Sequence, residues 1–154
     1  MVDRICYNCY VTLCKGNERE EEYMKDRILV VDDISVNRDI LAEMFEEEYE
    51  VIPASNGKEA LNILSIQMGK LSAMLLDLMM PGMDGYAVLA KMQEKRLTGM
   101  IPVIVISAAD SDESIEKCKQ LGVKHFISRP FSKEDAKGVI SLAISEFNYD
   151  EQSE

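Results

Sequence analysis

The sequence has little positive charge, no long apolar run and only one histidine. Lys and Arg number 17 against 28 Asp and Glu, which gives a formal net charge of −11 and a pI near 4.6. A phosphate backbone or an anionic membrane surface is bound by clustered Lys and Arg, so neither is an expected partner of this chain. The longest apolar runs span only a few residues, far fewer than the roughly 20 needed to cross a bilayer.

Export signals and paired metal-binding motifs are also lacking. The N-terminus lacks the apolar core of a signal peptide, and four cysteines without such a signal are typical of free thiols in a reducing compartment, so we expect a cytoplasmic protein. Cys6 and Cys9 have Cys-x-x-Cys spacing with Cys14 nearby, but no second pair supplies the ligands for a closed zinc site. A thiol-metal or redox site therefore remains an alternative to a flexible leader.

The composition suits one folded domain. The chain has 154 residues, of which 47% are hydrophobic, enough for one sizeable core. We divide it into a cysteine-bearing leader (1–26), a folded domain (27–148) and a short acidic tail (149–154). From Arg27 onward, short apolar segments alternate with amphipathic segments of helical length, which is typical of an α/β fold with a parallel sheet and crossover helices on both faces. The predicted strands are Arg27 to Val31, Glu50 to Ala54, Ala73 to Leu76, Val103 to Ile106 and Lys124 to Ile127.

Five helices are predicted between and after these strands. Ser35 would cap the first, which has Ile40 among its core-facing residues. The last would begin behind the cap Ser132, run over residues 133–147, and direct Leu142 toward the core. The other three are expected to begin near Gly57, after the cap Asp84, and after Ser111 or Asp112.

The predicted strands end in polar residues. In an open parallel sheet, reactive groups lie just beyond the carboxyl ends of the strands. The first predicted strand ends in Asp32 and Asp33, the third in Asp77, the fourth at Ser107, and Arg129 follows the fifth. Three carboxylates, a hydroxyl and a cation are therefore predicted to meet at one edge of the sheet.

Three carboxylates this close would repel one another strongly unless a hard divalent cation lay among them. Magnesium fits, because it takes one or two carboxylates and leaves positions for water and a phosphoryl group. Asp77 could then accept a phosphoryl group as a nucleophile. Taken singly, Asp32 and Asp33 could be a helix cap and a solvated turn, and Ser107 a turn hydroxyl. Their joint placement favours phosphoryl transfer.

Four segments carry a resemblance to a known family: Ile28-Leu29-Val30-Val31-Asp32-Asp33, Leu75-Leu76-Asp77-Leu78-Met79-Met80-Pro81-Gly82-Met83-Asp84-Gly85, Pro102-Val103-Ile104-Val105-Ile106-Ser107-Ala108 and Arg129-Pro130-Phe131. In their order and spacing, residues 26 to about 148 resemble the receiver domain of two-component response regulators. The resemblance implies a flavodoxin-like, doubly wound sheet of five parallel strands in the order 2-1-3-4-5. It also implies a signalling switch that catalyses, at most, its own phosphorylation and dephosphorylation.

The resemblance assigns roles to individual residues. Asp77 becomes the phosphoryl acceptor, and Asp32 and Asp33 join it in holding Mg²⁺ with the Met79 backbone carbonyl. Ser107 becomes the switch hydroxyl that turns toward the phosphoryl group. The phosphoryl donor would be a sensor histidine kinase or a phosphotransfer protein.

Phosphorylation is expected to change the face formed by the fourth helix, the fifth strand and the fifth helix. Phe126 falls where the family places its switch aromatic, and this face would bind a partner, an output domain or a second copy. His125 lies in the same predicted strand and has no supporting neighbours for metal or phosphoryl chemistry, so we interpret it as structural and partly exposed. The resemblance also implies a cis Arg129–Pro130 bond.

Arg129 departs from the family pattern, which has a lysine at this position. Arginine is a wide planar fork and lysine a compact point charge, so they are not interchangeable at a tight site. Arg129 could contact a phosphoryl oxygen in place of the lysine, or hold a resting salt bridge to Asp77. The second case would make the chain a pseudo-receiver, an interaction module without phosphorylation. An aspartyl-phosphate hydrolase is disfavoured, because Met79 occupies the position of the acid-base aspartate of such enzymes.

Overall fold

The computed structural model describes residues 25–108 and 111–152, and Cys6, Cys9 and Cys14 lie outside these ranges. Five parallel strands form one sheet in the order β2-β1-β3-β4-β5, which confirms the predicted order. Their bounds are β1 (Asp26–Val31), β2 (Tyr49–Ala54), β3 (Leu71–Asp77), β4 (Val103–Ser107) and β5 (His125–Ser128). The strands thus match the predicted segments with shifts at their ends.

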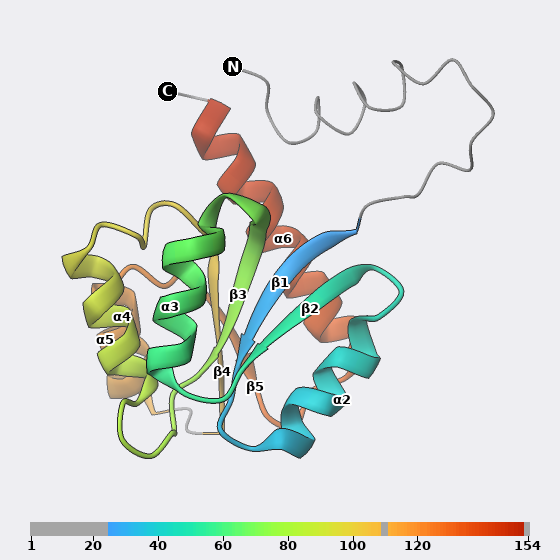
Figure 1. Cartoon of the computed structure of the whole chain (residues 1–154), viewed down its shortest axis with the longest axis horizontal. Helices are drawn as coiled ribbons and strands as arrows, with labels where there is room; N and C mark the ends of the chain where they lie inside the picture. The colour runs from blue at the N-terminus through green and yellow to red at the C-terminus, as the bar shows by residue number, and fades with distance from the viewer. Residues whose placement is uncertain (1–24, 109–110, 153–154) are drawn as a thin grey trace.

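Helices cover both faces of the sheet, with α2 and α6 on one side and α3, α4 and α5 on the other (Figure 1). Their bounds, with one short 3-10 helix, are α2 (Ser35–Phe45), α3 (Gly57–Gln67), η1 (Met68–Lys70), α4 (Gly85–Glu94), α5 (Asp112–Gln120) and α6 (Lys133–Gln152). Among the described residues, no helix has both the length and the apolar character needed to span a membrane.

Successive side chains of a strand point to opposite faces of the sheet, so the hydrophobic core has two parts, one on each face. In β1, Ile28 and Val30 pack toward α2 and α6, whereas Leu29 and Val31 pack toward the opposite helices. Strand β3 is buried along its whole length, as expected of a central strand covered on both faces. The central position of β3 holds the end of this strand, and therefore Asp77, in a fixed place.

Side-chain caps begin most of the helices, and the sequence predicts several of them correctly. The carboxylate of Asp84 accepts a hydrogen bond from the Ala87 N–H at 2.8 Å. The Ser111 and Ser132 hydroxyls accept from N–H groups three residues further along α5 and α6, at 3.2 and 3.1 Å. These contacts satisfy backbone donors that have no partner inside the helix.

The prediction that Ser35 caps α2 is wrong. Ile34 occupies the cap position and makes no side-chain capping bond. The Ile34 N–H instead donates to the Asp32 carboxylate at 2.9 Å. This bond fixes the turn that leads into α2, and the backbone carbonyl of Ile34 accepts the Asn37 and Arg38 N–H groups at 3.1 and 3.3 Å.

Two residues predicted to face the core are half exposed: Ile40 at 50% and Leu142 at 52%. In α2 the buried positions are Leu41 and Phe45, one turn apart, and Ile40 lies beside this stripe. Helix α6 also continues to Gln152, beyond the predicted end at residue 147. There the Asp150 carboxylate lies 3.5 Å from the Lys124 ammonium, just before β5.

Gly85 allows α4 to begin directly against the end of β3. Its N–H donates to the Leu78 carbonyl at 3.0 Å. A Cβ at this position would lie 2.6 Å from the Asp77 carbonyl oxygen and 2.7 Å from the Leu78 Cα, both main-chain atoms. The close approach of α4 to the strand that carries Asp77 therefore requires glycine.

We expect Gly85→Ala to lower the free energy of unfolding by about 1–3 kcal/mol, because the new methyl group overpacks against backbone that cannot rotate away. Gly138→Ala in α6 is the matched control, since nothing lies within 4 Å of its Cβ position. It should raise stability by about 0.5–1 kcal/mol. Urea unfolding followed by circular dichroism measures both, and equal effects of the two substitutions would contradict this account of Gly85.

Candidate functional site

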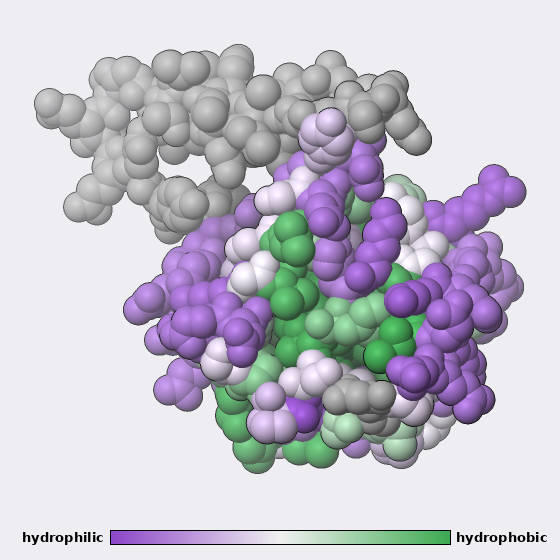
Figure 2. Space-filling model, turned by 180° about the vertical axis from the view of Figure 1, so that it is seen from behind, coloured by the Kyte–Doolittle hydropathy of each residue, from purple (hydrophilic) through white to green (hydrophobic). Residues whose placement is uncertain are grey.

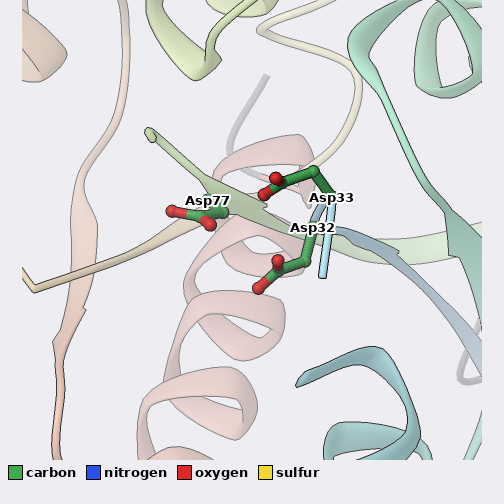
Figure 3. Close-up of side chains that lie close together, drawn as sticks. All are labelled: Asp32, Asp33 and Asp77. Carbon is green, nitrogen blue, oxygen red and sulfur yellow. The ribbon is translucent and has the colours of Figure 1, made fainter. Parts of the chain in front are cut away.

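The carboxyl ends of β1 and β3 bring three carboxylates together (Figure 3). Asp32 and Asp33 directly follow β1, and Asp77 is the last residue of β3. One carboxylate oxygen from each lies within 4.8 Å of the others. Parallel neighbouring strands end at the same edge of a sheet, so the pairing of β1 with β3 is what creates this cluster.

Asp32 is the most enclosed of the three, with 1% of its surface exposed. Its Oδ1 accepts the Ile34 N–H at 2.9 Å. Its Oδ2 accepts from the Asn37 side-chain amide at 3.2 Å and from Arg129 Nη2 at 2.8 Å. Arg129 therefore neutralises this carboxylate, and the three donors together orient it.

Arg129 pairs with Asp32, whereas one sequence interpretation gave it a resting salt bridge to Asp77. Its side chain is 27% exposed, and the Nη2–Oδ2 distance is 2.8 Å. Its backbone N–H donates to the Ser107 carbonyl at 3.1 Å, which joins the ends of β4 and β5. The Arg129–Pro130 peptide bond is cis, as the resemblance implied.

Asp77 is 6% exposed, and its Oδ1 accepts one hydrogen bond, from the Met79 N–H at 3.1 Å. Burial raises the pKa of the Asp77 carboxyl, and the negative charges of Asp32 and Asp33 raise it further. The Met79 N–H and the Arg129 charge act in the opposite direction without cancelling the rise. The charged form of Asp77 is therefore disfavoured until a cation joins the cluster.

Asp33 supplies an observation that tests whether a cation fits. Its Oδ1 is buried and has no hydrogen-bond partner among the described residues. A buried acceptor without a partner costs free energy, so such an atom in a stable fold points to a ligand. Carboxylate oxygens are the ligands that Mg²⁺ prefers, and the three side chains therefore fit a hard divalent cation.

Sequence reasoning missed two residues that contact Asp32, both in the first turns of α2. Asn37 bonds its carboxylate, and Arg38 Nη1 donates to its backbone carbonyl at 2.6 Å. Polar side chains one turn after an acidic strand end were the available signal. Their role depends on how α2 turns back over the strand, which a periodicity pattern does not specify.

The remaining predicted residues lie in and beside β4 and β5. Ser107 is the last residue of β4 and is buried. Phe126 is half-buried and packs against the core cluster on the α3, α4 and α5 side. His125 is at the opposite end of β5 from the acidic cluster, where its Nε2 lies 2.9 Å from Glu146 Oε2, in agreement with a structural role.

Comparisons with known proteins agree with this geometry. The family model described as the response regulator receiver domain matches residues 28–141. The chain is 39% identical over 108 residues to response regulator PleD of Caulobacter vibrioides, which covers 70% of this chain and 23% of that protein. It is 34% identical over 118 residues to sporulation initiation phosphotransferase F of Bacillus subtilis, which covers 76% of this chain and 92% of that protein. The chain thus spans about a quarter of PleD and nearly all of the second relative.

Solved structures show the same fold. The receiver domain of the Francisella response regulator 1452 aligns with a TM-score of 0.70 at 28% identity, covering 79% of this chain and 98% of that one. The chemotaxis protein CheY4 of Vibrio cholerae aligns with a TM-score of 0.70 at 22% identity, covering 78% and 99%. With the family match over most of the folded residues, these findings show that the chain belongs to the response regulator receiver domain family.

Proposed function

We propose that this chain accepts a phosphoryl group on Asp77 from a sensor histidine kinase or a phosphotransfer protein in the cytoplasm. The observation that carries the proposal is the convergence of three carboxylates in which the buried Asp33 oxygen has no partner within residues 25–108 and 111–152. The similarity to a relative named as a phosphotransferase supports it.

In the proposed step, an Asp77 oxygen attacks the phosphorus atom of the donor. The bond between phosphorus and the donor atom breaks, and its electron pair leaves with the donor. Asp32, Asp33, Asp77 and the Met79 carbonyl would hold Mg²⁺, which when bound neutralises charge on the transferring oxygens. Water later attacks the phosphorus, which restores the Asp77 carboxylate and releases inorganic phosphate.

We assign the readout to Ser107, Phe126 and the face of α5, β5 and α6. A phosphoryl group adds negative charge and strong acceptor oxygens at the end of β3, and the buried Ser107 hydroxyl at the neighbouring strand end can donate to them. Movement of Ser107 and the segment after it would leave room for Phe126, which packs on the same side of β5 as Val105 does on β4. The result is a population shift without a change of fold.

Figure 2 looks onto the side of the molecule that carries this face, where hydrophobic residues gather in a hollow between hydrophilic ones. Beside β5, a cavity of about 380 Å³ is lined by Ile101, Val103, Ala143 and Phe147, with charged Lys124 and Glu146 among its other residues. A mixed apolar and charged hollow is suited to a protein surface, and we propose that an output partner or a second copy binds here.

Donor docking requires a different surface. Asp77 is nearly buried, so a protein that delivers a phosphoryl group to it must cover the surrounding edge of the sheet. Exposed apolar side chains lie along the start of α2 and after β3: Ile34, Val36, Ile40 and Met79, with exposures from 50% to 68%. We propose that this group, called the α2 apolar surface, contacts the donor protein.

The alternative is a pseudo-receiver that binds partners without phosphorylation. The specific observation in its favour is the Arg129–Asp32 ion pair, which occupies one of the three carboxylates. Two observations on the part of the chain that the structure describes favour the phosphorylated switch instead: the Asp33 oxygen has no partner there, and Asp77 accepts only the Met79 N–H.

Incubation of the full chain with a small-molecule phosphoryl donor and magnesium should add one phosphoryl group, detected as intact-protein mass. Asp77→Asn should gain none, because the nucleophile is lost. Asp84→Asn is the matched control, since Asp84 caps α4 without belonging to the cluster, and an asparagine cap is equivalent. An unmodified wild type would establish the pseudo-receiver, and modification of Asp77→Asn would place the acceptor elsewhere.

Asp77→Asn should also raise the melting temperature by about 2–5 °C at pH 7.5 without magnesium. The folded-state pKa of Asp77 lies above its ordinary value, so its contribution to stability is present at low pH and is lost as the pH rises through that pKa. Removing the charge should thus have no benefit at pH 3 and a full benefit above neutrality. Thermal unfolding across this range is the measurement, and a destabilising effect at pH 7.5 would contradict it.

Val36→Ser with Ile40→Ser should slow transfer from a phosphorylated protein donor by about tenfold, because apolar contact area is lost at the α2 apolar surface. Transfer from a small-molecule donor should stay unchanged. Ile66→Ser in α3 is the control, being an apolar residue that is 71% exposed and outside this surface. Equal slowing with both donors would mean that the substitutions disturb the site itself.

A further inference from the structure

The Asp32 carboxylate binds the Arg129 guanidinium and also belongs to the cluster that would hold a divalent cation. We propose that Arg129 competes with magnesium for Asp32, and so acts as a resident cation that weakens metal binding in the resting state. The inference rests on the proposed metal site, and does not depend on whether Asp77 is phosphorylated.

The ion pair is positioned to be strong. Arg129 Nη2 lies 2.8 Å from Asp32 Oδ2, and the Asp32 side chain is 1% exposed. Attraction between opposite charges is screened less when one partner is enclosed than when both lie at the surface. Holding a guanidinium there is consequently favourable as long as no other cation neutralises Asp32.

The three carboxylates differ in what a cation would displace. Asp32 already accepts from Ile34, Asn37 and Arg129. Asp33 has one buried oxygen without a described partner, and Asp77 accepts the Met79 N–H at its Oδ1. Metal binding at the Asp33 oxygen therefore displaces no contact among the described residues, whereas a second positive charge beside Asp32 repels the guanidinium.

The main chain of Arg129 allows the side chain to move alone. Its N–H is bound to the Ser107 carbonyl at 3.1 Å, and its side chain is partly exposed. A guanidinium repelled from Asp32 can rotate toward Asp77 or toward solvent without disturbing the β4–β5 pairing. Metal binding would thereby release the very cation that the family pattern assigns to the phosphoryl group.

Magnesium titration of the full chain by isothermal calorimetry, with no phosphoryl donor present, tests the proposal. Arg129→Gln should bind magnesium about five- to tenfold more tightly than the wild type, the equivalent of losing one competing ion pair. Arg38→Gln is the matched control. It also removes one positive charge that contacts Asp32, but Arg38 bonds the backbone carbonyl of Asp32 and not its carboxylate. Its affinity gain should stay below about twofold.

A double substitution adds a second check. In an Asp32→Asn background, Arg129→Gln should give no further gain in affinity, because the contested carboxylate is gone. An unchanged or weaker affinity of Arg129→Gln, or an equal gain from Arg38→Gln, would overturn the proposal. Binding in the wild type with no effect of Arg129→Gln overturns only this inference, while no binding in any variant overturns the proposed metal site as well.

A measurement on the wild type tests the proposal without relying on the folding of any variant. The side-chain Nε resonance of Arg129, followed by ¹⁵N NMR during the magnesium titration, should shift with the same midpoint as the Asp33 amide. A resonance that does not move while the Asp33 amide does would show that the guanidinium keeps its contact, and would refute the competition.

Discussion

Repulsion among three clustered carboxylates, two of them buried, is the constraint on which the arrangement of this site depends. The pairing of β1 with β3 places Asp32, Asp33 and Asp77 so close that they cannot all be charged without compensation. Each carboxylate meets the constraint differently. Asp32 is neutralised by Arg129, the pKa of Asp77 is raised, and Asp33 keeps a buried oxygen without a described partner. The cluster is thus stable enough to fold and still favours a cation.

The rest of the fold supports this unfavourable cluster. Strand β3 is buried on both faces, and α4 begins against its last residues because Gly85 has no side chain. Close-packed surroundings of this kind do not relax to separate the charges. The free energy stored in the cluster is therefore available to ligand binding, which is the general reason why perturbed carboxylates mark functional sites.

The sequence predicted a parallel sheet and the edge where polar residues meet, because both follow from local signals that recur along the chain, whereas the strand order was predicted from the resemblance to receiver domains. Apolar segments alternate with helical ones, and Asp84 and Ser132 are caps that act within one turn. The failures depend on tertiary contacts. Ile34 and not Ser35 occupies the cap position of α2, Ile40 lies beside the buried stripe, and no pattern could say that Arg129 reaches Asp32, 97 residues away in sequence.

The partner of Arg129 changes how its substitution for lysine is understood. The planar guanidinium of Arg129 offers several donors in fixed directions, and one of them binds Asp32. The backbone N–H of Arg129 binds the Ser107 carbonyl at the end of β4. A main-chain hydrogen bond therefore links the resting cation, just after β5, to the residue of the proposed switch hydroxyl at the end of β4. Any event that draws Ser107 toward Asp77 also acts on the main chain of Arg129. The connection therefore gives charge at the acidic cluster a direct route to β5, beside the packing of Phe126 against the core.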